Sequence, residues 1–252
     1  MTFEQTPEGK LRATGRTRNA VIAVDRGVLG FARHWLLWFN LFIFAYVGIP
    51  FLAPVLMHYG YNETAKVIYT VYSPLCHQLG YRSWFLFGEQ AHYPRQDFAA
   101  RTGIQIDSPA GLLESKGFNG NAGLGYKVAF CQRDVAIYGG ILLAGLIYGL
   151  PPVRRRLKPL HWVGWIVIGL VPIALDGFSQ LFTQYPYSDI DFFRFIFGWL
   201  PSRESTPFYR TLTGGLFGLA NVWLAYPYVE QSMREVKDDL ERKLARAASL
   251  SQ

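Results

Sequence analysis

The sequence predicts an all-α membrane protein with about four transmembrane helices, an outward-facing re-entrant or interfacial helical segment and a small extracytoplasmic cap. Three observations lead to this fold class. Hydrophobic residues make up 50% of the 252 residues and charged residues only 17%, against roughly 25% in soluble proteins. Four apolar stretches approach the roughly 20 residues that a helix needs to cross the hydrocarbon core. Basic residues gather at the ends of these stretches, which is the pattern of the positive-inside rule.

The four predicted spans differ in how they begin and end. The first has tryptophans near one interface, and Pro50 and Pro54 are expected to kink its outer half. The second is stopped by Pro151 and Pro152, just before an arginine run. In chain order the spans cover residues 34–57, 134–150, 160–182 and 207–229, which together form a membrane domain over residues 34–229.

Basic residues also predict the orientation of the spans. The Arg-Arg-Arg-Leu-Lys sequence at 154–158 is denser in positive charge than the neighbouring loops, so we expect it to be cytoplasmic. The basic segment 1–33 and the charged tail 230–252 then share that side, and loops 58–132 and 183–206 face outward. No secretory signal peptide is expected, since the first thirty residues lack an apolar core. Alternating charges at helical spacing predict a helix in the tail.

The outward loop contains two different parts. Residues 61–88 are apolar and aromatic but broken by Pro74 and Gly80, so we expect a helix ending near Ser73, then a turn and a short interfacial piece. A fifth crossing here would put the arginine run outside, against the charge rule. Residues 89–130 are more polar and rich in loop-forming sequence, which predicts the small cap.

Both cysteines, Cys76 and Cys131, lie on the predicted outward side. One interpretation is a Cys76–Cys131 disulfide, which an oxidising exterior permits and which would stabilise the fold by roughly 4 kcal/mol on closing a loop of about 56 residues. A second is a transition-metal site, such as zinc, with Cys76, His77, Cys131 and Asp134 as ligands. Adjacent residues on a helix point about 100° apart, so Cys76 and His77 share an ion only if the backbone turns, for which Pro74 is the expected cause. A redox-active thiol pair is the third interpretation.

Charged groups at membrane depth suggest further functional residues. Asp176 lies near the outer end of the third span, with Gln180 one helical turn later, and Arg210 lies one turn into the fourth span. Because these two spans run antiparallel, we expect Asp176 and Arg210 to pair, in a role that is either functional or purely structural. The polar residues expected around the candidate ligands are Gln78, Arg82, Arg133, Asp176, Gln180, Arg203 and Arg210. Glycines in the later spans, among them Gly214 and Gly218, predict close helix packing.

Four motifs follow one another along the chain: SPLCHQLGYRSWFLFG, FCQRDVAIYGG, PIALDGFSQLF and SRESTPFYRTLTGGLFG. Together they resemble the signature blocks of a bacterial membrane protein family known as domain of unknown function 2085, over roughly residues 66–220. The positions that match the family motifs are Cys76, His77, Gln78, Arg82, Cys131, Arg133, Tyr138, Asp176, Gly177, Gln180, Arg203, Arg210, Thr213 and Gly214.

The chain departs from the family pattern at one candidate ligand. Many members are similar to C-x-R-C in the second block, whereas this chain has C-Q-R-D, so Asp134 replaces a cysteine. The insert from Glu89 to Lys127 is also longer than in the shortest members. The resemblance implies a multi-pass protein of the bacterial cell membrane, and the charge pattern predicts that both termini are cytoplasmic. The resemblance implies no reaction.

Three function classes therefore stay open, and whether the protein is an enzyme is undecided. The first is a metal-binding or redox membrane protein. The second is a non-catalytic accessory or assembly subunit of a larger membrane complex with a structural disulfide. The third is an interfacial lipid-modifying enzyme. The expected partners are the lipid bilayer and other membrane subunits. Nucleic acid is excluded because the net charge of +7 forms no basic stripe, and nucleotide because no phosphate-binding loop occurs.

Overall fold

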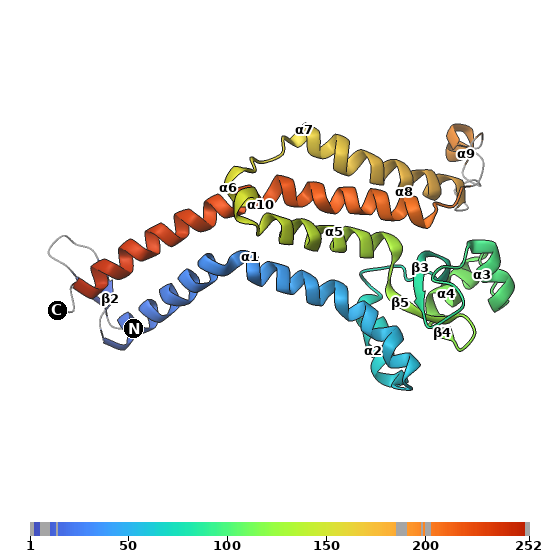
Figure 1. The fold of residues 1–252 in the computed structure, drawn as a ribbon, viewed down its shortest axis with the longest axis horizontal. Helices are drawn as coiled ribbons and strands as arrows, with labels where there is room; N and C mark the ends of the chain where they lie inside the picture. Colours follow the sequence, from blue (N-terminus) through green and yellow to red (C-terminus); the bar gives the residue numbers. More distant parts are fainter. Residues whose placement is uncertain are drawn as a thin grey trace. The chain divides into compact units, whose positions relative to one another are not determined.

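The chain folds into two compact units, each described here by itself. The computed structural model describes residues 3–5, 11–13, 15–184, 191–197, 199 and 203–249. One unit comprises Met1–Leu41 with Ala225–Gln252, and the other comprises Phe42–Leu224. Two long helices, α1 (Gly15–His58) and α10 (Pro207–Ser249), have one end in each unit (Figure 1). Parts of the predicted outward loop 183–206 lie outside the described residues, as do parts of the segment 1–33 and of the tail 230–252.

The first unit pairs the start of α1 with the end of α10 in antiparallel fashion. Arg18 donates from Nη2 to the carbonyl oxygen of Ala247 at 2.7 Å, and Arg33 pairs with Glu241 at 2.8 Å. The strands β1 (Phe3–Gln5) and β2 (Leu11–Ala13) also pair antiparallel in this unit. The predicted helix of the tail is therefore present, but as the continuation of α10 rather than as a separate element.

The second unit contains the remaining elements and all the candidate site residues. Its helical elements besides α1 and α10 are α2 (Asn62–Tyr72), η1 (Gly80–Arg82), α3 (Arg95–Thr102), α4 (Pro109–Gly117), α5 (Gln132–Tyr148), α6 (Pro151–Arg156), α7 (Trp162–Trp165), η2 (Ile166–Leu170), α8 (Val171–Gln184) and α9 (Asp191–Phe197). Its strands are β3 (Ser83–Leu86), β4 (Gly120–Asn121) and β5 (Gly125–Cys131).

Helices α5, α8 and α10 run side by side in this unit (Figure 1). The predicted close packing of glycines is confirmed between α5 and α10. A Cβ atom added at Gly218 would lie 2.3 Å from the carbonyl oxygen of Ile137, and one at Gly214 would lie 2.8 Å from that of Arg133. Because only glycine allows this approach, the backbone of α10 lies directly against the part of α5 that carries Arg133.

The helix of α7, η2 and α8 widens just before the site. Residues Ile166–Leu170 have π-helical hydrogen bonding. Pro172 has no N–H group to donate to Ile168, and a π-helical turn accommodates such a missing bond. This turn sets the rotation of the next residues, which include Asp176 and Gln180.

A three-stranded antiparallel sheet in the order β3-β5-β4 corrects the all-α expectation. Ser83 pairs with Cys131 at one end of β3 and Leu86 with Tyr126 at the other. Gly125 permits the tight turn into β5, since its φ is +79° and a Cβ there would meet the carbonyl oxygen of Leu86 at 2.4 Å. The sheet therefore delivers Cys131 to the start of α5.

Two hydrophobic clusters hold the sheet and the neighbouring helices in place. Tyr69 and Tyr72 of α2 pack with Cys76 and with Phe130 of β5. The predicted cap has a core of its own, made of Leu79, Tyr81, Phe85, Tyr93, Phe98, Ile104, Ile106 and Leu124. As expected, α2 ends at Tyr72 and the chain then turns.

Two helical stretches among the described residues are long and apolar enough to cross a membrane, namely Gly15–His58 and Trp162–Thr183. The first contains the predicted span 34–57, and the second covers residues 162–182 of the predicted span 160–182. Helix α5, with 17 residues, is at the short limit of about 17–25 residues for a span. Pro50 and Pro54 lie inside α1, and the residue of this helix with non-helical φ and ψ is His34, at the start of the first predicted span.

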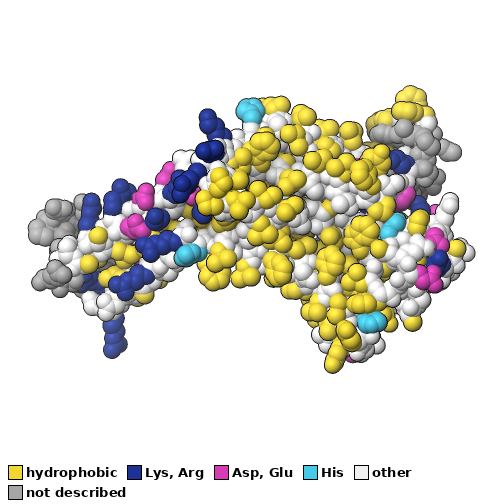
Figure 2. Space-filling model, viewed as in Figure 1, with side chains coloured by type: hydrophobic (Ala, Val, Ile, Leu, Met, Phe, Trp, Pro, Cys, Tyr) yellow, Lys and Arg dark blue, Asp and Glu magenta, His cyan; other side chains and the backbone are white. Residues whose placement is uncertain are grey.

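Hydrophobic side chains cover much of the viewed face of the second unit (Figure 2). Large hydrophobic side chains of this unit are strongly exposed: Leu146 is 56% exposed, Val167 60%, Leu175 67% and Phe178 55%. Large contiguous apolar surfaces of this kind are typical of contact with lipid or with another protein.

Candidate functional site

Cys76 and Cys131 are brought together by a buried glutamine. Gln78 adopts a left-handed backbone conformation, with φ of 52°, which turns the chain directly after Cys76. Its side-chain amide donates to the carbonyl oxygens of Tyr69 (2.9 Å) and Ala129 (3.0 Å), so it links α2 to β5. The expected backbone turn is therefore present: the chain turns at residues 73–75, which include Pro74, and again at Gln78.

The sulfur of Cys76 accepts two backbone hydrogen bonds. The N–H of Gln78 donates to it at 3.4 Å and the N–H of Cys131 at 3.2 Å. Amide donors of this kind favour negative charge on sulfur. The thiol of Cys131 in turn donates to Oδ2 of Asp134 at 3.2 Å.

Three of the four predicted ligands therefore form one cluster. The ligand atoms of Cys76, Cys131 and Asp134 all lie within 4.8 Å of one another. Hydrogen bonding to Cys131 and burial raise the pKa of the Cys76 thiol. Both cysteines are free, so the predicted disulfide is not formed in this structure. Three acidic groups this close need protons or a cation between them, and the donor set suits a borderline metal such as zinc.

His77, the fourth predicted ligand, is not part of this cluster. Its side chain is exposed, in contrast to the buried Cys76 and Gln78 on either side of it. It does line the same cavity, which measures about 600 Å³ and is also bordered by Cys76, Cys131 and Asp134.

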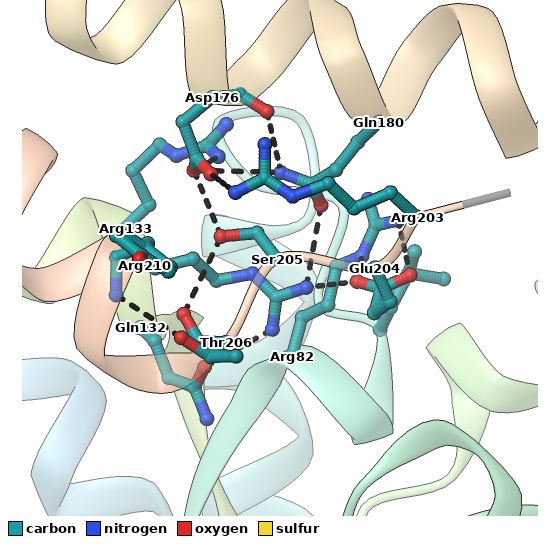
Figure 3. A network of polar contacts seen from close by, with 12 residues as sticks. Arg82, Gln132, Arg133, Asp176, Gln180, Arg203, Glu204, Ser205, Thr206 and Arg210 are labelled. Atoms are coloured by element: carbon teal, nitrogen blue, oxygen red, sulfur yellow. Dashed lines mark hydrogen bonds and ion pairs between the residues drawn. The ribbon is translucent and has the colours of Figure 1, made fainter. Parts of the chain in front are cut away.

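Asp176 is the centre of a second cluster, drawn in Figure 3. Its carboxylate is 4% exposed and accepts from Arg133 at 2.5 Å and from Arg203 at 3.3 Å. The hydroxyl of Ser205 donates to the same carboxylate at 2.9 Å. Gln180 donates to the backbone carbonyl of Asp176 at 2.9 Å, so the two residues lie on one face of α8 as predicted.

Glu204 joins Arg82 and Arg210, as Figure 3 also shows. Arg82 contacts it with two nitrogens, Nε at 2.9 Å and Nη2 at 3.1 Å. Arg210 pairs with the same carboxylate and also donates to the side chains of Gln132 (3.1 Å) and Gln180 (3.3 Å). The expected Asp176–Arg210 ion pair is therefore wrong, because each residue takes a different partner and Gln180 lies between them.

Gln132 extends this network to His92 in the cap. Its amide donates to Nδ1 of His92 at 2.8 Å. Burial, and then the charge of Arg210, lower the pKa of His92 to about 4. The imidazole is therefore neutral at pH 7 and accepts this hydrogen bond.

Sequence reasoning missed Gln132, Glu204 and Ser205. All three lie inside the quoted motifs, Gln132 in FCQRD and the other two in SREST. Glu204 is the more informative omission. Asp176 is the one carboxylate predicted alongside the two arginines Arg203 and Arg210. Two arginines with one carboxylate call for a second acid, and Glu204 lies directly after Arg203 in the sequence.

These features define a class: a mainly helical membrane protein with a cysteine–aspartate cluster and an arginine–carboxylate network beside one cavity. The family model described as "Predicted membrane protein (DUF2085)" matches residues 122–224. The family resemblance inferred from the motifs is thus confirmed over these residues, which contain the last three motif blocks. The first block, with Cys76 and His77, precedes them.

A curated relative is similar to more than half of the chain. The chain is 28% identical over 160 residues to an uncharacterized protein, MJ1492, of the archaeon Methanocaldococcus jannaschii. The similarity covers 59% of this chain and 74% of the relative. No solved structure matches the chain.

Proposed function

We propose that this is a four-span protein of the cell membrane that binds a transition-metal ion at Cys76, Cys131 and Asp134 on its outer side. The observation that carries the proposal is the approach of these three ligand atoms to within 4.8 Å of one another. A tetrahedral zinc ion holds sulfur at about 2.3 Å and oxygen at about 2.0–2.2 Å, so small shifts of the side chains would close the three atoms around one ion.

The fourth coordination position would face the cavity. Three protein ligands and one open position are the arrangement of catalytic rather than structural zinc sites. His77 lines this cavity and is the protein group that could occupy the position. A molecule entering the cavity could displace it, whereas Cys76 is fixed by the backbone hydrogen bonds to its sulfur.

The proposed topology follows the charge rule. Spans at 34–57, 134–150, 160–182 and 207–229 would place both termini and the arginine run of α6 in the cytoplasm, with the cap outside. Helices α5 and α10 supply the second and fourth spans. Their glycine contact supports this assignment, since such close approach is typical of helices that pair inside a bilayer.

Elemental analysis with thiol counting under denaturing conditions tests the metal site. We expect about one metal ion per chain and two free thiols in detergent-purified protein, with the metal lost in Cys131→Ser and Asp134→Asn. His77→Ala should weaken binding less than either. Asp97→Asn is the matched control, because this carboxylate pairs with Arg101 on the surface of the cap.

The opposite result would favour another function, that of an accessory subunit. Absence of metal together with absence of free thiols would make Cys76 and Cys131 a structural disulfide and would favour an accessory subunit. Membrane partners that co-purify equally with wild type and with Cys76→Ser would then be expected.

A further inference from the structure

The cavity beside the cysteine cluster also has an excess of positive charge that the metal proposal does not use. Asp176 is shared by Arg133 and Arg203, and Glu204 is shared by Arg82 and Arg210. Four guanidinium groups thus face two carboxylates within this network. Arg82, Arg133 and Arg210 are only 19%, 23% and 2% exposed, and Asp134 is the carboxylate among the described residues that borders the cavity with them. Buried positive charge that is not fully balanced is costly, which indicates that a negatively charged group belongs here.

Three of these arginines border the cavity. Arg82 comes from η1, Arg133 from the first turn of α5 and Arg210 from α10. Arg203 does not line it. Guanidinium groups that converge from three elements are suited to a compact oxyanion with several acceptor oxygens, because each group presents parallel N–H donors.

Arg133 keeps unused donor capacity. One of its five N–H groups is directed at Asp176 through Nη2. Its Nε atom is buried and has no hydrogen-bond partner among the described residues. A Cβ atom at position 177 would lie 3.4 Å from Nη1, so Gly177 leaves room beside the guanidinium.

Part of the cavity lining is apolar. Leu170, Ala174, Phe178 and Leu181 come from the η2–α8 helix, and Leu75 from the turn after α2. Leu75 and Phe178 are each 55% exposed and Leu170 is 39% exposed, so this part of the lining continues onto the hydrophobic outer surface. A ligand that fills the cavity therefore meets both arginine side chains and hydrocarbon-like surface.

We propose that the cavity binds a membrane lipid with a phosphate monoester head group, its phosphate on Arg133, Arg82 and Arg210 and its chain along Leu75 and Phe178. A phosphate monoester carries about −1.5 to −2 charges at pH 7 and has three acceptor oxygens, so it can accept from all three guanidinium groups, whereas a carboxylate or a phosphodiester has one fewer such oxygen. The volume of about 600 Å³ accommodates a head group and part of a chain, within the usual range of roughly 300–1,000 Å³ for ligand sites. This proposal goes beyond metal binding and does not depend on it.

Lipid binding to the full-length protein in a non-ionic detergent tests the proposal. Native mass spectrometry would compare dioleoyl phosphatidic acid, dioleoyl phosphatidylglycerol and inorganic phosphate. We expect one saturable molecule of phosphatidic acid per chain, with affinity at least about 10-fold above that for phosphatidylglycerol. Inorganic phosphate should not displace it at equal concentration, because it lacks the chain.

Arg133→Gln and Arg203→Gln form a matched pair. Both remove one guanidinium from Asp176, but only Arg133 borders the cavity. Arg133→Gln should lower the affinity for phosphatidic acid roughly 10- to 100-fold, the usual loss for a charge-assisted hydrogen bond, whereas Arg203→Gln should change it less than about 3-fold.

Several results would overturn the proposal. They are equal affinity for the two lipids, equal effects of the two substitutions, displacement of lipid by an equal concentration of inorganic phosphate, and loss of lipid binding on treatment with EDTA. The last would mean that a metal ion, rather than the arginines, holds the head group. If Arg133→Gln does not fold, the three-ligand comparison on wild-type protein decides by itself.

Discussion

An ion pair on the surface of the first unit and the buried network of the second unit differ in how much solvent reaches them. In the first unit Arg33 and Glu241 pair while 50% and 40% exposed, as is usual on a helix surface. In the second unit Asp176 pairs with Arg133 while 4% and 23% exposed. Exposed pairs contribute little to stability, whereas burying charges is costly unless every group finds a partner. The buried network is therefore the better candidate for function, and the exposed pairs serve mainly for solubility and helix pairing.

The largest expected effect is that of Asp176→Asn. The substitution keeps the shape of the side chain but leaves Arg133 and Arg203 without their carboxylate. Breaking a buried ion pair on one side costs about 3–5 kcal/mol, so we expect a matching fall in the free energy of unfolding in detergent. Chemical denaturation measures it, and an effect below about 1 kcal/mol would show that water screens this network.

Gln78→Ala should have the next largest effect. It leaves the carbonyl oxygens of Tyr69 and Ala129 without their side-chain donor, which costs about 2 kcal/mol or more for buried groups. It should also release Cys76 from Cys131 and lower bound metal. Denaturation and elemental analysis check both effects, with the exposed Gln105→Ala as control. Normal metal content in Gln78→Ala would show that this glutamine does not position the cysteines.

A smaller effect is expected from the pH dependence of His92. Its pKa is lowered from 6.5 to about 4, so the unfolded chain binds more protons than the folded one between these values. Stability from the neutral imidazole is therefore full above pH 6.5 and is lost as the pH falls towards 4. The difference between the unfolding curves of wild type and His92→Gln isolates this contribution. Parallel pH profiles for the two proteins would contradict it.

The smallest effect is expected for Glu241→Gln in the first unit. This carboxylate is exposed and pairs with Arg33, so its removal should leave the unfolding transition unchanged within error. If Glu241→Gln lowered the free energy of unfolding as much as Asp176→Asn, burial would not explain the difference between the two ion pairs.

Much of the fold could be predicted from the sequence, because the length of an apolar stretch and the positions of charged residues and glycines are visible within a short segment. The end of α2 before Ser73, the start of α5 at Gln132 and the close packing at Gly214 and Gly218 follow from such signals. The sheet could not be predicted in this way. Strand β5 pairs with β3 across some forty residues of cap, and pairing at that distance in sequence leaves little local pattern.

The sequence indicated which residues lie near one another at the candidate site better than it indicated which of them pair. Asp176, Arg203 and Arg210 do lie in one network, since spacing and depth place them on the same level. Their pairing depends on Glu204, which follows a segment with no regular pattern, and on the helix rotation set by the π-helical turn at Ile166–Leu170. Side-chain partners of this kind are decided by tertiary packing, which a single sequence does not display.

X-ray absorption at the K-edge of the metal found by elemental analysis tests the central claim most directly. Binding at Cys76, Cys131 and Asp134 predicts two sulfur neighbours at about 2.3 Å, with the remaining nitrogen or oxygen neighbours at about 2.0–2.2 Å. One sulfur neighbour should disappear in Cys131→Ser. A spectrum with only oxygen and nitrogen neighbours would place any metal elsewhere and would contradict the proposed site.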